Sequence, residues 1–111
     1  MHELGIARNV VAIVCERAGS ANVTRVTLEV GELSGVMPEA IAFCFPLVAA
    51  DTTCANAVLD VRVIPGRSQC RTCGIDYAVP RLGVPCPCGS RDAVRLCGDE
   101  LNVKEMQLEA A

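Results

Sequence analysis

Four cysteines in the second half of this chain constrain its fold more than any other feature. Cys70 and Cys73 form a Cys-x-x-Cys pair, and after twelve intervening residues Cys86 and Cys88 form a second pair in a Gly- and Pro-rich run. Two thiolate pairs supplied by two turns can enclose one metal ion in a tetrahedral sulfur cage. Four thiolates leave Zn(II) no open coordination position. The pattern therefore predicts a structural zinc site that stabilises a segment too small to build its own core.

The cellular compartment decides between metal binding and disulfide formation in a chain with eight cysteines among 111 residues. Glu3 and Arg8 lie close to the start, and the apolar stretch from Val10 to Cys15 runs directly into charged residues, unlike a signal peptide. The longest uncharged run, from Ala40 to Ala50, is too short to cross a bilayer. We therefore expect a soluble, cytoplasmic protein whose cysteine cluster binds metal.

The cysteine pattern leaves some alternatives open. The second pair has one intervening residue where two are usual, so Cys97 is a reserve ligand for the shortened pair. A redox-active Cys-x-x-Cys is a competing interpretation, but such pairs usually open a helix in a βαβ context, whereas this one lies in a turn region. The remaining cysteines are interpreted as buried small hydrophobic residues or inert thiols: Cys15, Cys44 and Cys54.

Apolar periodicity predicts two helices. The residues from Glu3 to Ala18 have the spacing of an amphipathic helix, which Gly19 ends. Pro38 is suited to the first turn of a second helix, and Pro46 lies inside it, so we expect this helix to kink or stop near Phe45. The apolar side of the first helix comprises Leu4, Ile6, Ala7, Val10, Val11, Ile13 and Val14. The apolar surface of the second comprises Ile41, Phe43, Cys44, Phe45, Leu47 and Val48.

Alternation of apolar and polar residues predicts three strands, over residues 23–30, 57–63 and 101–109. In the last strand the apolar positions change from odd to even numbers, which predicts a bulge near Lys104 and Glu105. We expect this strand to pair with the first two. The side chains expected to face inward from the first two strands are Val26, Leu28, Val30, Leu59, Val61 and Val63.

Composition changes abruptly after the second strand. Residues 65–97 contain five Arg, two Asp and five of the eight cysteines, with little apolar periodicity. The sequence therefore predicts an α+β fold in which two helices pack on a three-stranded sheet, with a small zinc-ribbon-like domain of four cysteine ligands inserted. We expect residues 1–64 and 98–111 to form the larger domain and residues 65–97 to form the zinc-binding domain.

The amino terminus offers a second set of metal ligands. His2 is the only histidine of the chain. The terminal amine of Met1, the amide nitrogen of His2 and the His2 imidazole can form adjacent chelate rings, and Glu3 can supply a fourth ligand. Such a planar set of nitrogen and oxygen donors suits Ni(II) or Cu(II). A solvated terminal histidine without a metal is the simpler interpretation of His2 taken alone.

Several motifs follow one another along essentially the whole chain: Met1-His2-Glu3-Leu4, the run from Val26 to Val36 leading to Pro38-Glu39-Ala40, Phe43-Cys44-Phe45, the Cys-x-x-Cys pair, Cys-Pro-Cys-Gly-Ser from Cys86, and Gly98-Asp99-Glu100-Leu101. Together they resemble the HypA/HybF family of nickel metallochaperones for hydrogenase maturation. The resemblance implies a nickel-binding α+β domain that carries a small inserted zinc domain. It also implies that the protein is not an enzyme but delivers a metal.

The resemblance further implies the ligands and partners. His2 would be the essential nickel ligand, and a carboxylate near the second helix, such as Glu39, could approach the nickel. The ion would be held with modest affinity and transferred to the large subunit of a [NiFe] hydrogenase with the help of the GTPase HypB, by a monomer or homodimer. Nickel affinity should fall with pH, because the nitrogen ligands must lose protons. The implied ligands are Met1, His2 and Glu3 for nickel, and Cys70, Cys73, Cys86 and Cys88 for zinc.

The main competing class is a zinc-ribbon adaptor that binds RNA or protein. Residues 65–97 carry a formal charge of +3, from five Arg and two Asp, while the other residues carry −6, from five basic and eleven acidic residues. Zn(II) with four thiolates would reduce the charge of the insertion to +1, and Tyr77 is its only aromatic side chain, so nucleic acid is not expected as a partner. An enzyme is also disfavoured, because the chain has no second histidine, P-loop or Gly-rich dinucleotide turn.

Overall fold

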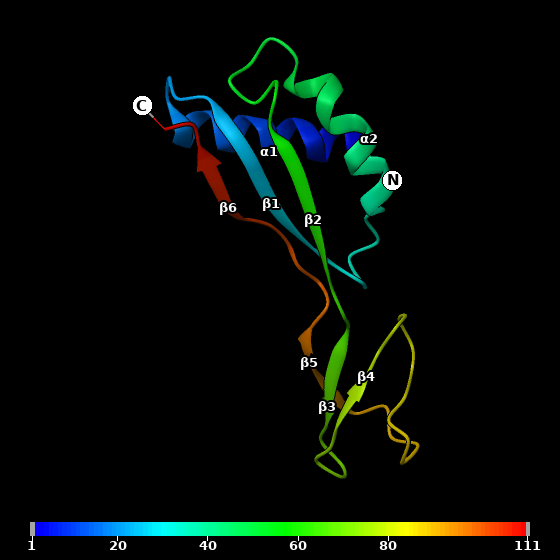
Figure 1. Ribbon diagram of the computed structural model, residues 1–111. Helices are drawn as coiled ribbons and strands as arrows, with labels where there is room; N and C mark the ends of the chain where they lie inside the picture. The colour runs from blue at the N-terminus through cyan, green and yellow to red at the C-terminus, as the bar shows by residue number, and fades with distance from the viewer. Residues whose placement is uncertain (1, 111) are drawn as a thin grey trace.

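The computed structural model describes residues 2–110, which form two small sheets arranged end to end (Figure 1). The elements in chain order are α1 (Glu3–Ala18), β1 (Val23–Gly31), α2 (Pro38–Ala49), β2 (Val58–Ile64), β3 (Arg67–Cys70), β4 (Asp76–Ala78), β5 (Ala93–Cys97) and β6 (Leu101–Leu108). The strand order is β2-β1-β6 in the first sheet and β4-β3-β5 in the second. The molecule is elongated, with extents of 54 × 27 × 17 Å. No helix among the described residues could span a membrane.

The first sheet has the predicted strands, and β1 lies at its centre. β1 pairs in parallel with β2 and antiparallel with β6, so the last strand rejoins the others as expected. Val26, Leu28 and Val30 are buried, as the alternation predicts. Val63 was expected to face inward in the same way, but its side chain is exposed, because β2 is an edge strand of this sheet.

The predicted bulge in the last strand is present. Thr27 of β1 pairs with Glu105, and the next residue, Leu28, pairs with Val103. Lys104 is therefore the extra residue on β6. Its insertion returns Met106 to the buried side of the sheet, which explains the change of apolar phase along the strand.

Helix α1 has the predicted bounds, and Gly19 follows it with a φ of 63°. Both helices contribute side chains to one core against the first sheet, and the α1 side chains in that core are Val10, Val11 and Val14. Leu4 and Ile13 do not belong to it, although the apolar pattern includes them. They lie at the margins of the buried stripe, where solvent reaches them.

Helix α2 begins at Pro38 as predicted but continues through Pro46 to Ala49, so the expected stop near Phe45 is wrong. Phe45 and Ala49 are both buried in the core. The free energy of this packing compensates for the loss of the backbone hydrogen bond that Pro46 cannot donate. The buried side of this helix is narrower than expected, because a helix packed against a sheet buries only the side chains along one face. Two of the apolar side chains predicted for that surface are exposed: Phe43 and Leu47.

A segment after β1 joins the two sheets. The Leu33 amide donates to the Gly98 carbonyl (2.7 Å) and the Gly66 amide donates to the Glu32 carboxylate (3.0 Å). The Leu33 side chain packs with Tyr77 in a small second core, which the sequence pattern of residues 65–97 does not predict. The cysteine-rich segment therefore has a small core, but this core includes the side chain of Leu33, which lies outside the segment.

Gly31→Ala is expected to destabilise the protein by about 2 kcal/mol or more. A Cβ on Gly31 would clash with the Gly98 carbonyl oxygen, which belongs to the backbone, so the end of β1 and the segment between β5 and β6 would have to separate. Urea unfolding followed by circular dichroism measures the effect. Gly5→Ala is the matched control: a Cβ there meets nothing within 4 Å in helix α1, so a gain of about 0.5–1 kcal/mol is expected. Equal effects at the two positions would contradict the close approach at Gly31.

Candidate functional site

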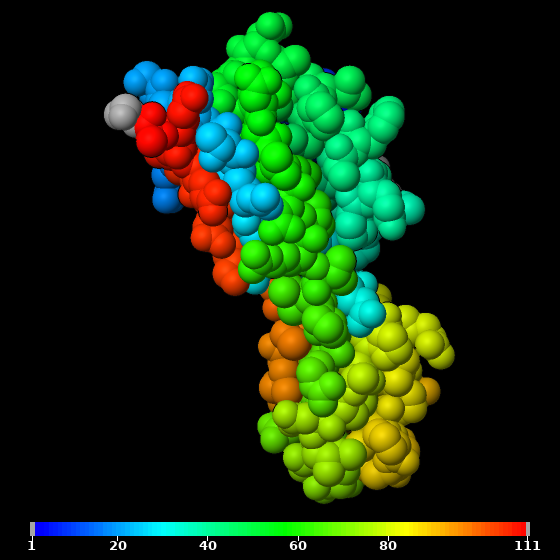
Figure 2. Space-filling view, viewed as in Figure 1, coloured from blue at the N-terminus to red at the C-terminus, as the bar shows by residue number. Residues whose placement is uncertain are grey.

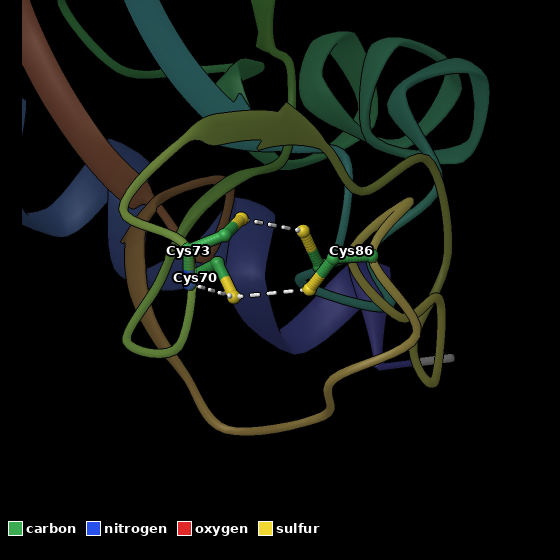
Figure 3. A group of neighbouring side chains, drawn as sticks. Cys70, Cys73 and Cys86 are labelled. Atoms are coloured by element: carbon green, nitrogen blue, oxygen red, sulfur yellow. Dashed lines mark hydrogen bonds between the residues drawn. The ribbon is translucent and has the colours of Figure 1, made fainter.

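The structure brings the four predicted zinc ligands together. The sulfur atoms of Cys70, Cys73, Cys86 and Cys88 all lie within 4.8 Å of one another. The Sγ atoms of Cys73 and Cys86 are 3.5 Å apart, and those of Cys70 and Cys88 are 3.7 Å apart. Figure 3 shows Cys70 and Cys73 facing Cys86 across the space between two turns.

The first turn follows directly from the end of β3. Cys70 is the last residue of that strand, and the Gly74 amide donates to its carbonyl oxygen (2.9 Å). Gly74 has a φ of 82°, a conformation that glycine adopts without steric cost. The Cys73 amide donates to the Sγ of Cys70 (3.4 Å), so the turn already directs a backbone dipole at one sulfur.

The second turn is closed by backbone hydrogen bonds despite its shortened Cys-x-Cys spacing. The Gly89 amide donates to the Cys86 carbonyl (2.8 Å), and the Cys86 amide donates to the Ser90 carbonyl (3.0 Å). Cys86 is buried and Cys88 is exposed, so the two sulfurs approach the cluster from different depths. One intervening residue is thus sufficient for both cysteines to reach it.

Polar contacts hold the two turns against each other. The hydroxyl groups of Thr72 and Ser90 are 2.8 Å apart. Arg71 donates through its side chain to the Asp92 carboxylate (2.9 Å), and its amide donates to the Asp92 carbonyl (2.9 Å). The role of these four residues was not predicted from the sequence; the only signal was that each turn carries small polar residues next to its cysteines.

The sulfur geometry and electrostatics fit a tetrahedral metal ion. At a Zn–S distance of about 2.3 Å, tetrahedral sulfurs are about 3.8 Å apart, close to the 3.5 and 3.7 Å seen here. The hydrogen bond from the Cys73 amide lowers the pKa of Cys70, whereas burial raises the pKa of Cys86. Cys86 therefore holds its thiol proton more tightly than Cys70 does, and a divalent cation compensates the negative charge that is left when this proton is displaced.

The other cysteines lie outside this cluster. Cys97, the reserve ligand, directs its thiol to the Pro65 carbonyl oxygen (3.3 Å) instead. Cys54 is buried at the end of the first core, as expected, and its Sγ lies 3.6 Å from that of the half-buried Cys15. Burial raises the pKa of Cys54 to about 11, which keeps it a neutral thiol. Cys44 is half-buried on α2.

The predicted nickel ligands lie at the start of α1. Met1 is outside the described residues. His2 is exposed and immediately precedes α1. Its carbonyl oxygen accepts a hydrogen bond from the Ile6 amide (2.9 Å). Glu3 is buried, and its carboxylate accepts a hydrogen bond from the Met37 amide (3.1 Å). The amino terminus and this amide lower the pKa of Glu3 to about 2.

The hydrogen bond from Met37 gives Glu3 a role that was not predicted from the sequence. Met37 is the residue immediately before α2, so this contact ties the start of α1 to the start of the second helix. Glu39, in the first turn of α2, is exposed in the same part of the molecule. An ionised carboxylate thus lies directly after the only histidine, at a point where the two helices meet.

Comparison with known proteins identifies the family. A family model described as "Hydrogenase/urease nickel incorporation, metallochaperone, hypA" matches residues 1–108. The chain belongs to the HypA family. It is 45% identical over 109 residues to a hydrogenase maturation factor HypA of Nostoc sp. strain PCC 7120, covering 98% of this chain and 96% of that protein. It is 44% identical over 110 residues to the factor of the same name from Geobacter metallireducens, covering 98% and 100%.

Solved HypA structures share the fold. The solution structure of the Ni metallochaperone HypA from Helicobacter pylori aligns with a TM-score of 0.68 at 20% identity, covering all of both chains. A second solution structure, of a HypA protein, aligns with a TM-score of 0.69 at 18% identity, covering 100% and 98%. The two-helix, two-sheet architecture with a cysteine cluster is therefore that of the HypA fold, and the expected α+β class is confirmed.

Proposed function

We propose that this HypA-family chain binds Ni(II) at its amino terminus and delivers it to the large subunit of a [NiFe] hydrogenase during maturation. The observation that carries the proposal is the separation of two unlike donor sets: an exposed histidine at the first turn of α1 and a partly buried sulfur cluster in the other sheet. In Figure 1 helix α1 lies with the first sheet, at the opposite end of the molecule from the turn after β3. One site suits exchange of a metal and the other suits permanent retention.

Zinc is the metal proposed for the cysteine cluster, with Cys70, Cys73, Cys86 and Cys88 as its ligands. Four sulfurs at tetrahedral spacing leave no position for a substrate or for exchange. The ion would stabilise residues 65–97, which we propose as a separate domain inserted between residues 1–64 and 98–111. Its function is structural.

Nickel is proposed to bind the terminal amine of Met1, the amide and imidazole nitrogens of His2, and Glu3. His2 is exposed, so a ligand from another protein can reach its nitrogen donors and replace them one at a time. The HypA-family chain thus acts by transfer and not by turnover, and we propose the cytoplasm as its compartment and the GTPase HypB as a partner in release.

The fold adds an argument against the RNA-binding alternative. Tyr77, the single aromatic side chain of residues 65–97, is buried in the second core and does not offer a ring for stacking on bases.

Nickel transfer tests the proposal. The chain, loaded with one equivalent of Ni(II), is incubated with the nickel-free hydrogenase large subunit and an excess of a chelator that captures free nickel, and the nickel in the re-isolated subunit is measured. We expect about tenfold more nickel from the loaded chain than from a Ni(II) salt at the same concentration, because transfer through a protein contact avoids the free ion. Equal yields from the chain and the salt would contradict delivery.

A further inference from the structure

Two cysteines outside the sulfur cluster lie against each other in the first core. Cys15 belongs to the last turn of α1, Cys54 lies in the loop between α2 and β2, and their Sγ atoms are 3.6 Å apart. Figure 2 shows the loop after α2, in green, at the opposite end of the molecule from the cysteine-rich segment, in yellow and orange. The pair therefore lies apart from both proposed metal sites, since the nickel ligands are at the other end of α1.

The two thiols have unequal environments. Cys15 is half-buried, and its Sγ accepts a hydrogen bond from the Thr53 hydroxyl (3.7 Å). Burial raises the pKa of Cys15, but the hydrogen bonds that it accepts from Thr53 and Cys54 outweigh burial and lower this pKa below its ordinary value. Cys54 is completely buried, and burial together with the neighbouring Cys15 raises its pKa to about 11. Cys15 is thus the thiol that ionises and that solvent can reach, while Cys54 keeps its proton.

The backbone holds the two sulfurs at a distance from which a disulfide can form. Bonded sulfurs are about 2.05 Å apart, so each of these sulfurs has to move by only about 0.8 Å. Cys15 is fixed in a helix. The loop at Cys54 is also held, because the Cys54 amide donates to the Thr52 hydroxyl (3.0 Å) and the Ala57 amide donates to the Cys54 carbonyl (3.0 Å). Rotation about the two Cα–Cβ bonds supplies a movement of this size without displacing either backbone segment.

We propose that Cys15 and Cys54 are a modification site, a peroxide-reactive thiol pair that forms a reversible disulfide. The oxidant is a hydroperoxide. The Cys15 thiolate attacks the terminal oxygen of the hydroperoxide, the O–O bond breaks, and a sulfenic acid forms while the leaving alkoxide takes up the proton that Cys15 released. The Cys54 sulfur then attacks the Cys15 sulfur, the S–O bond breaks, and the hydroxide leaves as water with the Cys54 proton.

The reaction balances with the hydroperoxide as its only co-reactant. Two thiols and one hydroperoxide give one disulfide, one alcohol and one water, and two electrons pass from the sulfurs to the peroxide. A dithiol reductant reverses the modification by thiol–disulfide exchange. The disulfide connects the end of α1 to the loop before β2, which already contacts the start of β1, because the Val23 amide donates to the Thr53 carbonyl (2.9 Å). Oxidation therefore fastens one end of the first core and leaves both proposed metal sites unchanged.

Fragment mapping of the oxidised chain tests the pairing. The full, zinc-loaded chain is treated with a small molar excess of hydrogen peroxide, the remaining thiols are alkylated in denaturant, and the chain is cleaved with trypsin and with Asp-N protease. Asp-N cleaves before Asp51 and so separates Cys54 from Cys44, which trypsin leaves in one fragment. We expect mass spectrometry to find residues 9–17 disulfide-bonded to residues 51–59, and a dithiol reductant to release the two fragments.

Cys44 is an internal reference for the rate of oxidation. It is also half-buried, but among residues 2–110 its thiol has no hydrogen-bond partner. Cys15 should therefore react at least about tenfold faster than Cys44, because thiolate character and access determine the rate.

Three variants separate the roles of the two thiols. Cys54→Ala removes the second thiol, so the sulfenic acid at Cys15 should persist and be trapped by dimedone, a reagent for sulfenic acids. Cys15→Ala should leave Cys54 reduced, because that thiol is buried and neutral. Cys44→Ala is the matched control and should form the disulfide at the native rate. Circular dichroism verifies that the variants are folded, and the fragments of the native chain test the pairing without any substitution.

Three results would each overturn the proposal. One is a native chain that is oxidised at Cys44 as fast as at Cys15. The second is a native chain in which Cys15 forms its disulfide with a cysteine other than Cys54. The third is a Cys15→Ala variant in which Cys54 is oxidised as fast as in the native chain.

Discussion

Replacing Cys70 with serine is expected to reduce the zinc content from one ion per chain to less than about a tenth of that and to unfold residues 65–97. Cys70 is buried at the end of β3, and a serine hydroxyl is a poor replacement for a thiolate ligand. Zinc contributes roughly 10–16 kcal/mol in small zinc-binding peptides, which is comparable to the whole stability of a domain. The small core around Leu33 and Tyr77 cannot replace that contribution.

The first sheet should remain folded in the same variant, because every side chain of its buried core lies outside residues 65–97. Elemental analysis measures the zinc, and amide NMR spectra report which segment loses its structure. Cys97→Ser is the matched control: its thiol lies at the Pro65 carbonyl, outside the cluster, so zinc and structure should be retained. Full zinc retention by Cys70→Ser, or loss of zinc by Cys97→Ser, would show that the ligand set is wrong.

Replacing His2 with alanine is expected to weaken nickel binding by about a hundredfold or more, which is about 2.7 kcal/mol. His2 is the only histidine, so no other imidazole of the chain can compensate. Two extra residues before Met1 should have a similar effect, because they move the amine away from the His2 imidazole. Isothermal titration calorimetry with Ni(II) measures both, with the zinc content determined in parallel.

The same two residues added at the carboxyl terminus are the matched control and should leave nickel binding unchanged. Nickel affinity of the native chain should fall between pH 8 and pH 5, because imidazole and amide nitrogens release protons when they bind the ion. Glu3 does not contribute to this slope: its pKa is lowered to about 2, so its carboxylate remains ionised throughout that range. Equal nickel binding at pH 5 and pH 8 would contradict the amino-terminal site. Undiminished nickel binding by the chain extended before Met1 would contradict it as well.

The sequence alone was sufficient to predict features that depend on neighbours along the chain. The bounds of α1 and its end at Gly19 follow from local spacing and backbone conformation. The extra residue at Lys104 follows from the change of apolar phase within one strand. The four cysteines that come together were identifiable because each pair lies within a single turn, where short-range hydrogen bonds determine the geometry.

Only the tertiary structure decided features that depend on partners distant in sequence. Helix α2 continues through Pro46 because Phe45 and Ala49 are buried against other elements. The free energy of that burial is not part of the local helix propensity. The Glu3 carboxylate accepts a hydrogen bond from the Met37 amide, 34 residues away in sequence. The Cys97 thiol donates to the Pro65 carbonyl and does not join the sulfur cluster. Packing free energy comes from surfaces that meet only after the chain has folded, so a linear pattern specifies which residues are apolar but not which of them find a partner.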